Sequence, residues 1–168
     1  MKELLLGCGS RTSKDLHVNG NSEFHDLVRL DNNNDHNPTI VHDLRVHPLP
    51  FADNEFDEIH AYEVLEHLAQ QGDYEFFFKE FTEYWRILKP GGFFMASCPA
   101  PTSVWAFGDP SHKRVISKEC LVFLSQAQYR SQIGKTSMSD FRYLYKVDFQ
   151  TIYAEEKNGT TYFILKKV

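Results

Sequence analysis

The sequence predicts an α/β fold built on a doubly wound, mostly parallel β-sheet with one reversed strand near an edge. Three observations support this prediction. Short apolar segments typical of strands alternate with segments of helical periodicity. The first apolar segment ends in a glycine-rich turn, Gly7-Cys8-Gly9. The chain closes on two alternating segments joined by Asn158-Gly159, the strongest short-range signal for an antiparallel hairpin.

Five strands are expected ahead of that hairpin. Each is a short apolar or β-branched segment bounded by glycine, proline or an Asp-Asn turn signal. They cover residues 2–6, 27–31, 39–43, 56–61 and 92–98, and the hairpin strands lie within 146–156 and 160–168.

Helical segments fall between these strands. The strongest signal spans residues 73–88, where aromatic and apolar residues recur at intervals of three and four. Asp73 provides its N-cap, and the Lys-Pro-Gly-Gly run at 89–92 ends it. Shorter helices are expected at 64–70 and, opened by Ser117, at 117–130.

The segment that joins the first two strands departs from this pattern. Residues 10–26 contain few apolar residues at helical spacing, and Asn19-Gly20-Asn21 interrupts their middle. We therefore expect a short or irregular helix there.

Composition limits the class of protein. A length of 168 residues suits one domain, and we expect residues 1–168 to form it. The net charge of −5 argues against a surface that neutralises nucleic acid. No apolar run reaches the roughly 18 residues of a membrane-spanning helix, and the N-terminus carries no secretory signal. Three widely spaced cysteines favour free thiols in a reducing cytoplasm.

The ends of the first three strands point to a nucleoside ligand. In doubly wound sheets these ends converge on one crevice. Asp31, 24 positions after Gly7, suits a carboxylate that accepts hydrogen bonds from both hydroxyls of a ribose. The third small residue of a dinucleotide fingerprint is missing, since Thr12 stands there. A nicotinamide-dependent oxidoreductase is therefore the less favoured interpretation.

Five motifs in succession resemble the class I S-adenosylmethionine-dependent methyltransferases, above all their small predicted members. The motifs are LLLGCGS, LVRLD, VHDLRVHPLPFADNEFDEIHAYEVLEHL, EYWRILKPGGFFMASCP and DPSHKR, and they span about residues 4–116. The resemblance implies a seven-stranded, Rossmann-like sheet with its last strand reversed. It also implies that the cofactor is S-adenosyl-L-methionine.

The resemblance further implies which residues hold that cofactor. They are Gly7, Cys8, Gly9, Ser10 and Glu63 at the methionine part, Asp31 and Asn32 at the ribose, and Asp43 and Leu44 at the adenine. In the alternative interpretation, Asp31 and Asp43 are helix caps or loop stabilisers.

Two departures from the family pattern matter. Leu5 stands where an acidic residue is common, so one anchor for the cofactor's amino group is missing. The sequence also starts at its first strand, without the helix that covers the cofactor in many relatives. We expect an open site or one covered by a partner subunit, for which a homodimer is one arrangement.

We expect the molecule that accepts the methyl group to bind at the long loop 100–116, because loops of this length usually carry function. In this hypothesis the loop is a lid, with His112 as the catalytic base. Trp105, Lys113 and Arg114 bind the substrate, and the two cations suit an anionic acceptor. In the alternative, Asp109 and His112 only pin the loop to itself.

Other reactive side chains are assigned structural roles. No histidine pair has the spacing of a metal site, so no metal is expected. His67 is interpreted as a hydrogen-bonded structural histidine. Cys98 is interpreted as a buried small hydrophobe rather than a nucleophile.

The leading interpretation is methyl transfer from S-adenosylmethionine to a small-molecule acceptor by direct displacement. Nucleic acid is a less favoured methyl acceptor than a metabolite, because the chain has no Asp/Asn-Pro-Pro-aromatic run. The alternative is a non-catalytic S-adenosylmethionine-binding module that acts with a partner subunit.

Overall fold

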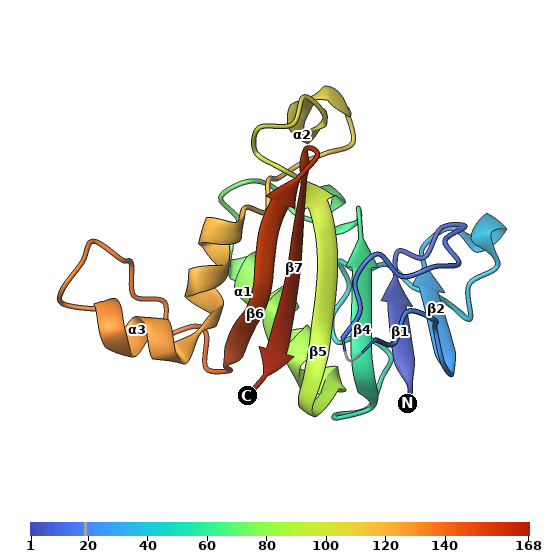
Figure 1. Ribbon diagram of the computed structural model, residues 1–168, viewed down its shortest axis with the longest axis horizontal. Helices are drawn as coiled ribbons and strands as arrows, with labels where there is room; N and C mark the ends of the chain where they lie inside the picture. The colour runs from blue at the N-terminus through green and yellow to red at the C-terminus, as the bar shows by residue number, and fades with distance from the viewer. Residues whose placement is uncertain (19) are drawn as a thin grey trace.

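The computed structural model describes residues 1–18 and 20–168, and its centre is a seven-stranded sheet of order β3-β2-β1-β4-β5-β7-β6 (Figure 1). The strands are β1 Glu3–Leu6, β2 Leu27–Asp31, β3 Ile40–Val41, β4 Phe56–Tyr62, β5 Leu88–Pro99, β6 Phe149–Lys157 and β7 Thr160–Lys167. β7 runs antiparallel to both of its neighbours, β5 and β6, and the remaining pairs are parallel. The predicted reversed C-terminal strand is confirmed.

The strand order reverses between β1 and β4, which is where doubly wound sheets bind ligands. The chain leaves β1 toward β2 and β3 on one side and continues from β4 toward β5 on the other. Figure 1 shows α2 (Trp105–Gly108) and the tip of the β6–β7 hairpin beyond the carboxyl end of β5, at the end of the sheet opposite to the N-terminus.

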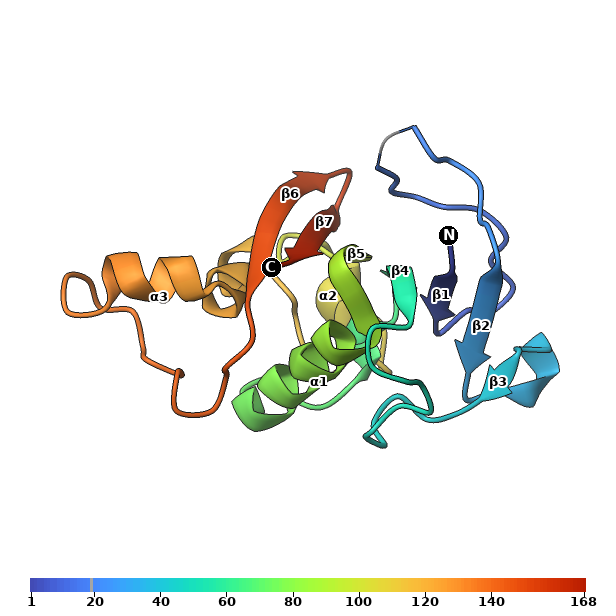
Figure 2. The same ribbon diagram turned by 90° about the horizontal axis from the view of Figure 1, so that it is seen from below.

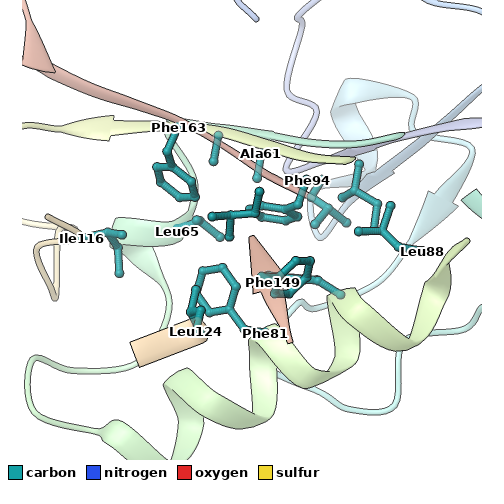
Figure 3. Close-up of a cluster of buried hydrophobic side chains, with 14 of the residues drawn as sticks. Ala61, Leu65, Phe81, Leu88, Phe94, Ile116, Leu124, Phe149 and Phe163 are labelled. Atoms are coloured by element: carbon teal, nitrogen blue, oxygen red, sulfur yellow. The ribbon is translucent and has the colours of Figure 1, made fainter. Parts of the chain in front are cut away.

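Helix α1 (Tyr74–Ile87) covers one face of the sheet and builds the main core (Figure 2). Its predicted N-cap is confirmed, because the Phe76 N–H donates to Asp73 Oδ1 over 3.0 Å. Phe81 and Tyr84 pack on Phe94 of β5, with ring centroids 5.6 and 4.8 Å apart. Figure 3 shows this layer of aromatic and aliphatic side chains between helix and sheet. Each fully buried ring contributes about 1.5–3 kcal/mol to folding.

The other helical segments are shorter than predicted. Residues 117–130 divide into the 3₁₀ helix η3 (Lys118–Leu124) and α3 (Gln126–Gln132), because Ser125 between them is extended. Gln126 is held by the chain before β6, since its N–H donates to Asp148 Oδ1 over 2.8 Å. The remaining short elements are η1 Asn34–His36 and η2 Leu65–His67, the latter within the predicted helix 64–70.

No helix forms in residues 10–18 or 20–26, so the expected short helix is absent from the described part of this segment. Asn19, part of the predicted interruption, lies outside the described residues. Lys14 gives the physical reason, because its ammonium is buried against Glu3 (2.9 Å) and Glu58 (2.8 Å). Pairing with both carboxylates holds Lys14 and its neighbours against the face of the sheet opposite α1, as an irregular loop (Figure 2).

Among the described residues, no helix combines the length and the apolar character needed to cross a membrane.

Candidate active site

A cavity of about 410 Å³ opens at the carboxyl end of β1 and β2, where the strand order reverses. It brings together five of the nine predicted cofactor residues: Gly7, Asp31, Asn32, Asp43 and Leu44. Lys113, predicted to bind the acceptor, also lines it. Cys8, Gly9, Ser10 and Glu63 are not part of its lining.

The glycine turn leaves β1 in a conformation that favours glycine. Gly7 and Gly9 have φ angles of +56° and +46°. A Cβ atom on Gly7 would lie 2.3 Å from Val64 Cγ2, whereas a Cβ on Gly9 would meet no atom within 4 Å. Cys8 between them is buried against Leu5 and Tyr62. The side chain of Cys8 therefore packs into the second face of the sheet, and the open space at this turn lies beside Gly9.

Asp31 is fixed by the backbone around it. Its Oδ2 accepts the Gly9 N–H over 2.8 Å, and its Oδ1 accepts the Asn33 N–H over 2.9 Å. The side chain thus ties the glycine turn to the loop after β2, as the loop-stabiliser alternative expects. A carboxylate oxygen has two lone pairs, so each oxygen retains one after these bonds. Asp31 is only 8% exposed, yet it lines the cavity.

Asp43 is paired with a neighbouring arginine. Arg45 donates to both oxygens of its carboxylate, with an Nη2–Oδ2 distance of 2.7 Å and an Nε–Oδ1 distance of 3.0 Å. These bonds lower the pKa of Asp43 to about 2, so it stays ionised at neutral pH. Arg45 itself lines the cavity beside Leu44.

A second cavity, of about 280 Å³, adjoins the first at the same end of the sheet. Residues 109–113 border both, since Ser111 and Lys113 line the first and Asp109 and His112 line the second. Glu63 and the predicted acceptor residue Trp105 also face the second cavity. The Glu63 carboxylate accepts the Ser97 hydroxyl over 2.8 Å, which anchors it to β5.

His112 is oriented by the start of α2. Its Nδ1 lies 2.8 Å from the carbonyl oxygen of Trp105, so Nδ1 carries the proton and donates it there. Nε2 of the neutral ring is then a free acceptor. The bond to Trp105 also pins the loop, as the alternative interpretation of His112 expects.

Glu66 was not predicted to be functional, although it precedes His67 directly. It is 2% exposed, and neither carboxylate oxygen accepts a hydrogen bond from any residue that the structure describes. Burial, reinforced by the carboxylate of Glu63, raises its pKa to about 7. The available signal was a charged residue between a leucine and a histidine, four positions after the end of β4, and the sequence alone does not show that this residue is buried.

Arg114 is where the structure departs most from the predicted acceptor site. It lines neither cavity and is buried against α1, with Nη2 2.7 Å from Glu80 Oε2 and Nε 2.7 Å from the Leu65 carbonyl oxygen. Its charge is already committed to a buried partner, so it is not available to an anionic acceptor.

Replacing Arg114 by methionine is expected to lower the free energy of unfolding by about 3–5 kcal/mol, because Glu80 would keep an unpaired buried charge. Urea unfolding followed by circular dichroism measures the change. The exposed neighbour provides the control, since Lys113→Met should change stability by less than about 0.5 kcal/mol. Adding Glu80→Gln to Arg114→Met should recover part of the loss. Equal stabilities for Arg114→Met and Lys113→Met would show that the buried pair does not stabilise the fold.

Comparison with known proteins identifies the family. The family described as a methyltransferase domain matches residues 4–96, which is more than half of the chain. A search of curated proteins finds no match. The match places the chain outside the nicotinamide-dependent oxidoreductases.

Solved structures share the fold at low sequence identity. An S-adenosylmethionine-dependent methyltransferase from Archaeoglobus fulgidus superposes with a TM-score of 0.58 at 16% identity, covering 99% of this chain and 86% of that one. A chain in the complex of the Trm112 methyltransferase activator with a proposed methyltransferase from Haloferax volcanii gives 0.61 at 15% identity, with coverages of 99% and 82%. An S-adenosylmethionine-dependent methyltransferase from Mesorhizobium loti gives 0.55 at 16% identity, with coverages of 99% and 90%.

The site fits the cofactor that this family and fold imply, S-adenosylmethionine. The positive-φ glycine turn leaves open space beside Gly9, and Asp31 presents carboxylate oxygens to the cavity. Together with the sheet order and the matched domain, these features show that the chain belongs to the methyltransferase-domain family and is a class I S-adenosylmethionine-dependent methyltransferase.

Proposed function

We propose that this methyltransferase transfers the methyl group of S-adenosylmethionine to a small molecule held between Glu63, Trp105 and His112. The observation that carries the proposal is that residues 109–113 border both cavities, with Ser111 and Lys113 lining the first and Asp109 and His112 lining the second. One cavity is lined by Asp31 and Asp43, the carboxylates we assign to the nucleoside, and the other is bordered by the loop after β5 and the hairpin tip. Its volume of about 280 Å³ suits a metabolite better than a polymer.

The cofactor side of the proposal keeps all nine predicted residues. Asp31 and Asn32 would hold the ribose, and Asp43 and Leu44 the adenine. The turn from Gly7 to Ser10 and Glu63 would border the methionine part. The open space at Gly9 supports close approach of a ligand to the backbone there.

Bound S-adenosylmethionine supplies an activated methyl group, which passes to the acceptor as its carbon–sulfur bond breaks. The protein then has mainly to align the acceptor, and alignment can contribute about 7–11 kcal/mol. An acceptor hydroxyl must also lose a proton. We assign proton acceptance to His112, whose Nδ1 donates to the Trp105 carbonyl oxygen, so that Nε2 carries the lone pair in the neutral tautomer.

Two measurements test the proposal. Calorimetry with S-adenosylhomocysteine should give saturable binding at one site per chain. Incubation of a cell extract with methyl-labelled S-adenosylmethionine should place the label in the small-molecule fraction. The proposal fails if S-adenosylhomocysteine does not bind, or if the label is found only in protein or nucleic acid.

Replacing His112 by alanine should slow methyl transfer by about 10²–10⁴-fold, because the proton acceptor is lost. Affinity for S-adenosylhomocysteine should stay unchanged. His112→Gln is the matched variant, since its amide can donate to Trp105 but cannot take a proton. Full activity in His112→Gln would mean that the side chain only pins the loop.

A second candidate function, a non-catalytic S-adenosylmethionine-binding module with a partner subunit, is favoured by the surface of α2. Trp105 and Phe107 are 65% and 80% exposed next to the second cavity. Exposed aromatic side chains of this kind mark interaction sites. One structural neighbour comes from a complex with a methyltransferase activator. Tight binding of S-adenosylhomocysteine without transfer to any acceptor fraction would select this candidate, and a homodimer seen by light scattering would supply the partner.

We infer a cytoplasmic location from the cysteines, since all three are free and Cys8 and Cys98 are buried. Fractionation of cells that express the tagged protein tests this location.

A further inference from the structure

Three side chains with metal-binding atoms meet between the two cavities, and we call them the Glu-His-His cluster: Glu66, His67 and His112. Nε2 of each histidine lies 3.9 Å from Glu66 Oε1. One ligand atom from each residue lies within 4.8 Å of the others. His112 reaches the cluster from the loop after β5, which is why spacing along the sequence predicted no metal.

Both histidines present an unprotonated nitrogen to the cluster. His112 Nδ1 donates to the Trp105 carbonyl oxygen over 2.8 Å. The Ser111 hydroxyl donates its proton to Asp109 Oδ1 over 2.6 Å, so it accepts from His67 Nδ1, 3.1 Å away. With both protons on Nδ1, the two Nε2 atoms carry lone pairs. A hydrogen bond at the other ring nitrogen is how proteins orient metal-binding histidines.

The carboxylate between them is an acceptor as well. Glu66 is 98% buried, and neither of its oxygens has a hydrogen-bond partner in the described part of the chain. Arg114 makes its hydrogen bonds to Glu80 and to the Leu65 carbonyl oxygen, and its remaining Nη1 group donates to neither oxygen of Glu66. Glu66, His67 and His112 thus bring three groups with acceptor atoms together, with the Cys98 thiol beside the Glu66 carboxyl. A buried carboxyl group that makes no well-aligned hydrogen bond is costly.

The separations fit a cation better than a shared proton. A distance of 3.9 Å is too long for a hydrogen bond between Glu66 and either histidine. Metal bonds of about 2.0–2.1 Å place two tetrahedral ligands roughly 3.4 Å apart, so each histidine nitrogen needs to approach Glu66 by about half an ångström. The two histidine nitrogens, within 4.8 Å of each other, need to approach by at most about 1.4 Å. Two imidazoles and one carboxylate suit Zn²⁺ and similar first-row ions rather than Ca²⁺ or Mg²⁺.

A second group of acidic residues and a histidine gives an internal contrast. Glu3, Glu58 and His60 also lie close together, but Lys14 fills that group with its ammonium, 2.9 Å from Glu3 and 2.8 Å from Glu58. The chain therefore satisfies one such cluster with its own cation and leaves the Glu-His-His cluster without one among the described residues.

We propose that the Glu-His-His cluster binds one divalent transition-metal ion, with Zn²⁺ as the representative, and that the ion orients the methyl acceptor. This inference rests on the proposed function and deepens it. Three protein ligands leave a coordination position open, and His112 lines the acceptor cavity. A bound ion would lower the pKa of an acceptor hydroxyl held there, and the proton would pass to solvent water. In the metal-bound protein His112 would hold the ion and serve as the base only when the ion is absent, so the slower transfer expected for His112→Ala would then follow from loss of the ion. The acceptor is a hydroxyl compound.

The test measures metal binding directly on the full chain after removal of metal with a chelator. Titration with Zn²⁺ against a competing chromophoric chelator should give one site per chain. Glu66→Gln and His112→Gln should each weaken it by at least about 100-fold, and Ser111→Ala by about 10–100-fold through loss of the bond that orients His67. His36→Gln, an exposed histidine in η1, is the matched control and should bind Zn²⁺ like the wild type.

Cobalt provides a spectroscopic signature, since Co²⁺ in a four- or five-coordinate site absorbs visible light and Glu66→Gln should remove that band. The proposal is overturned if the wild type shows no saturable site, or if Glu66→Gln and His112→Gln bind Zn²⁺ like His36→Gln. Affinity for S-adenosylhomocysteine is measured on the same metal-free samples. If metal-free protein binds S-adenosylhomocysteine but no metal site is found, only the metal proposal is refuted. If it does not bind S-adenosylhomocysteine, the proposed function is refuted.

Discussion

Replacing Asp31 by alanine is expected to weaken the binding of S-adenosylhomocysteine by about 10²–10⁴-fold. The variant loses two hydrogen bonds from ribose hydroxyls to a carboxylate, and bonds to charged groups contribute about 1.5–3 kcal/mol each. It also releases the N–H groups of Gly9 and Asn33, which the carboxylate holds in place at 2.8 and 2.9 Å. Isothermal calorimetry measures the affinity.

The control variants separate binding from folding. Asp35→Asn removes one negative charge from the same loop, but its side chain is exposed and does not line the cavity, so affinity should change less than twofold. Asp31→Asn keeps one carbonyl oxygen and should fall between wild type and Asp31→Ala. Thermal unfolding of each variant reports any loosening of the turn. Unchanged affinity in a folded Asp31→Ala variant would remove the ribose role of Asp31 and leave it as a loop stabiliser.

The parts of the fold that could be predicted have local causes. The hairpin of β6 and β7 was predicted because Asn158 and Gly159 both adopt positive φ, which few residue pairs tolerate. Helix α1 was predicted because its apolar face repeats every three to four residues and Asp73 caps it. Such signals act over a few neighbouring residues, so a sequence reveals them directly.

Other segments are decided by distant partners. The described residues between β1 and β2 form no helix because Lys14 reaches Glu3 and Glu58, and Glu58 is more than forty positions away. The helix predicted at 117–130 divides where Asp148 holds the first turn of α3. None of these partners can be recognised from the segment that it contacts, and such contacts override local helix propensity.

The candidate site shows the same division. Asp31 and Asp43 were placed at one cavity because the ends of parallel strands meet at one edge of a sheet. Arg114 was assigned to the acceptor because a charged residue in a loop motif suggests an exposed surface. Glu66 was missed because a charged residue in a short helix suggests the same. Burial against α1 makes Arg114 a core residue, and enclosure leaves Glu66 without a partner among the described side chains. Burial is a property of the assembled fold, and it decides the chemistry of both residues.

Replacing Gly7 by alanine is expected to lower the free energy of unfolding by about 2–5 kcal/mol. An alanine at φ +56° carries backbone strain of roughly 1–2 kcal/mol, and its Cβ lies 2.3 Å from Val64 Cγ2. Relief of that contact requires movement at the end of β4, and overpacking of this kind costs about 1–3 kcal/mol. Urea unfolding measures the loss.

Gly9→Ala is the matched variant, because its φ of +46° is similar but its Cβ meets no atom within 4 Å. It should lose only the strain of about 1–2 kcal/mol, while S-adenosylhomocysteine binding weakens because the methyl group occupies the space open to the ligand. Val64→Ala removes the Cγ2 atom, so the Gly7→Ala/Val64→Ala pair should be more stable than the sum of the single losses predicts. The explanation fails if Gly7→Ala and Gly9→Ala lose the same unfolding free energy and the effects of Gly7→Ala and Val64→Ala simply add in the double variant. Contact with Val64 would then not be the reason for glycine at position 7. The expected result instead assigns the two glycines different tasks: Gly7 lets the chain pass Val64, and Gly9 leaves room for the cofactor.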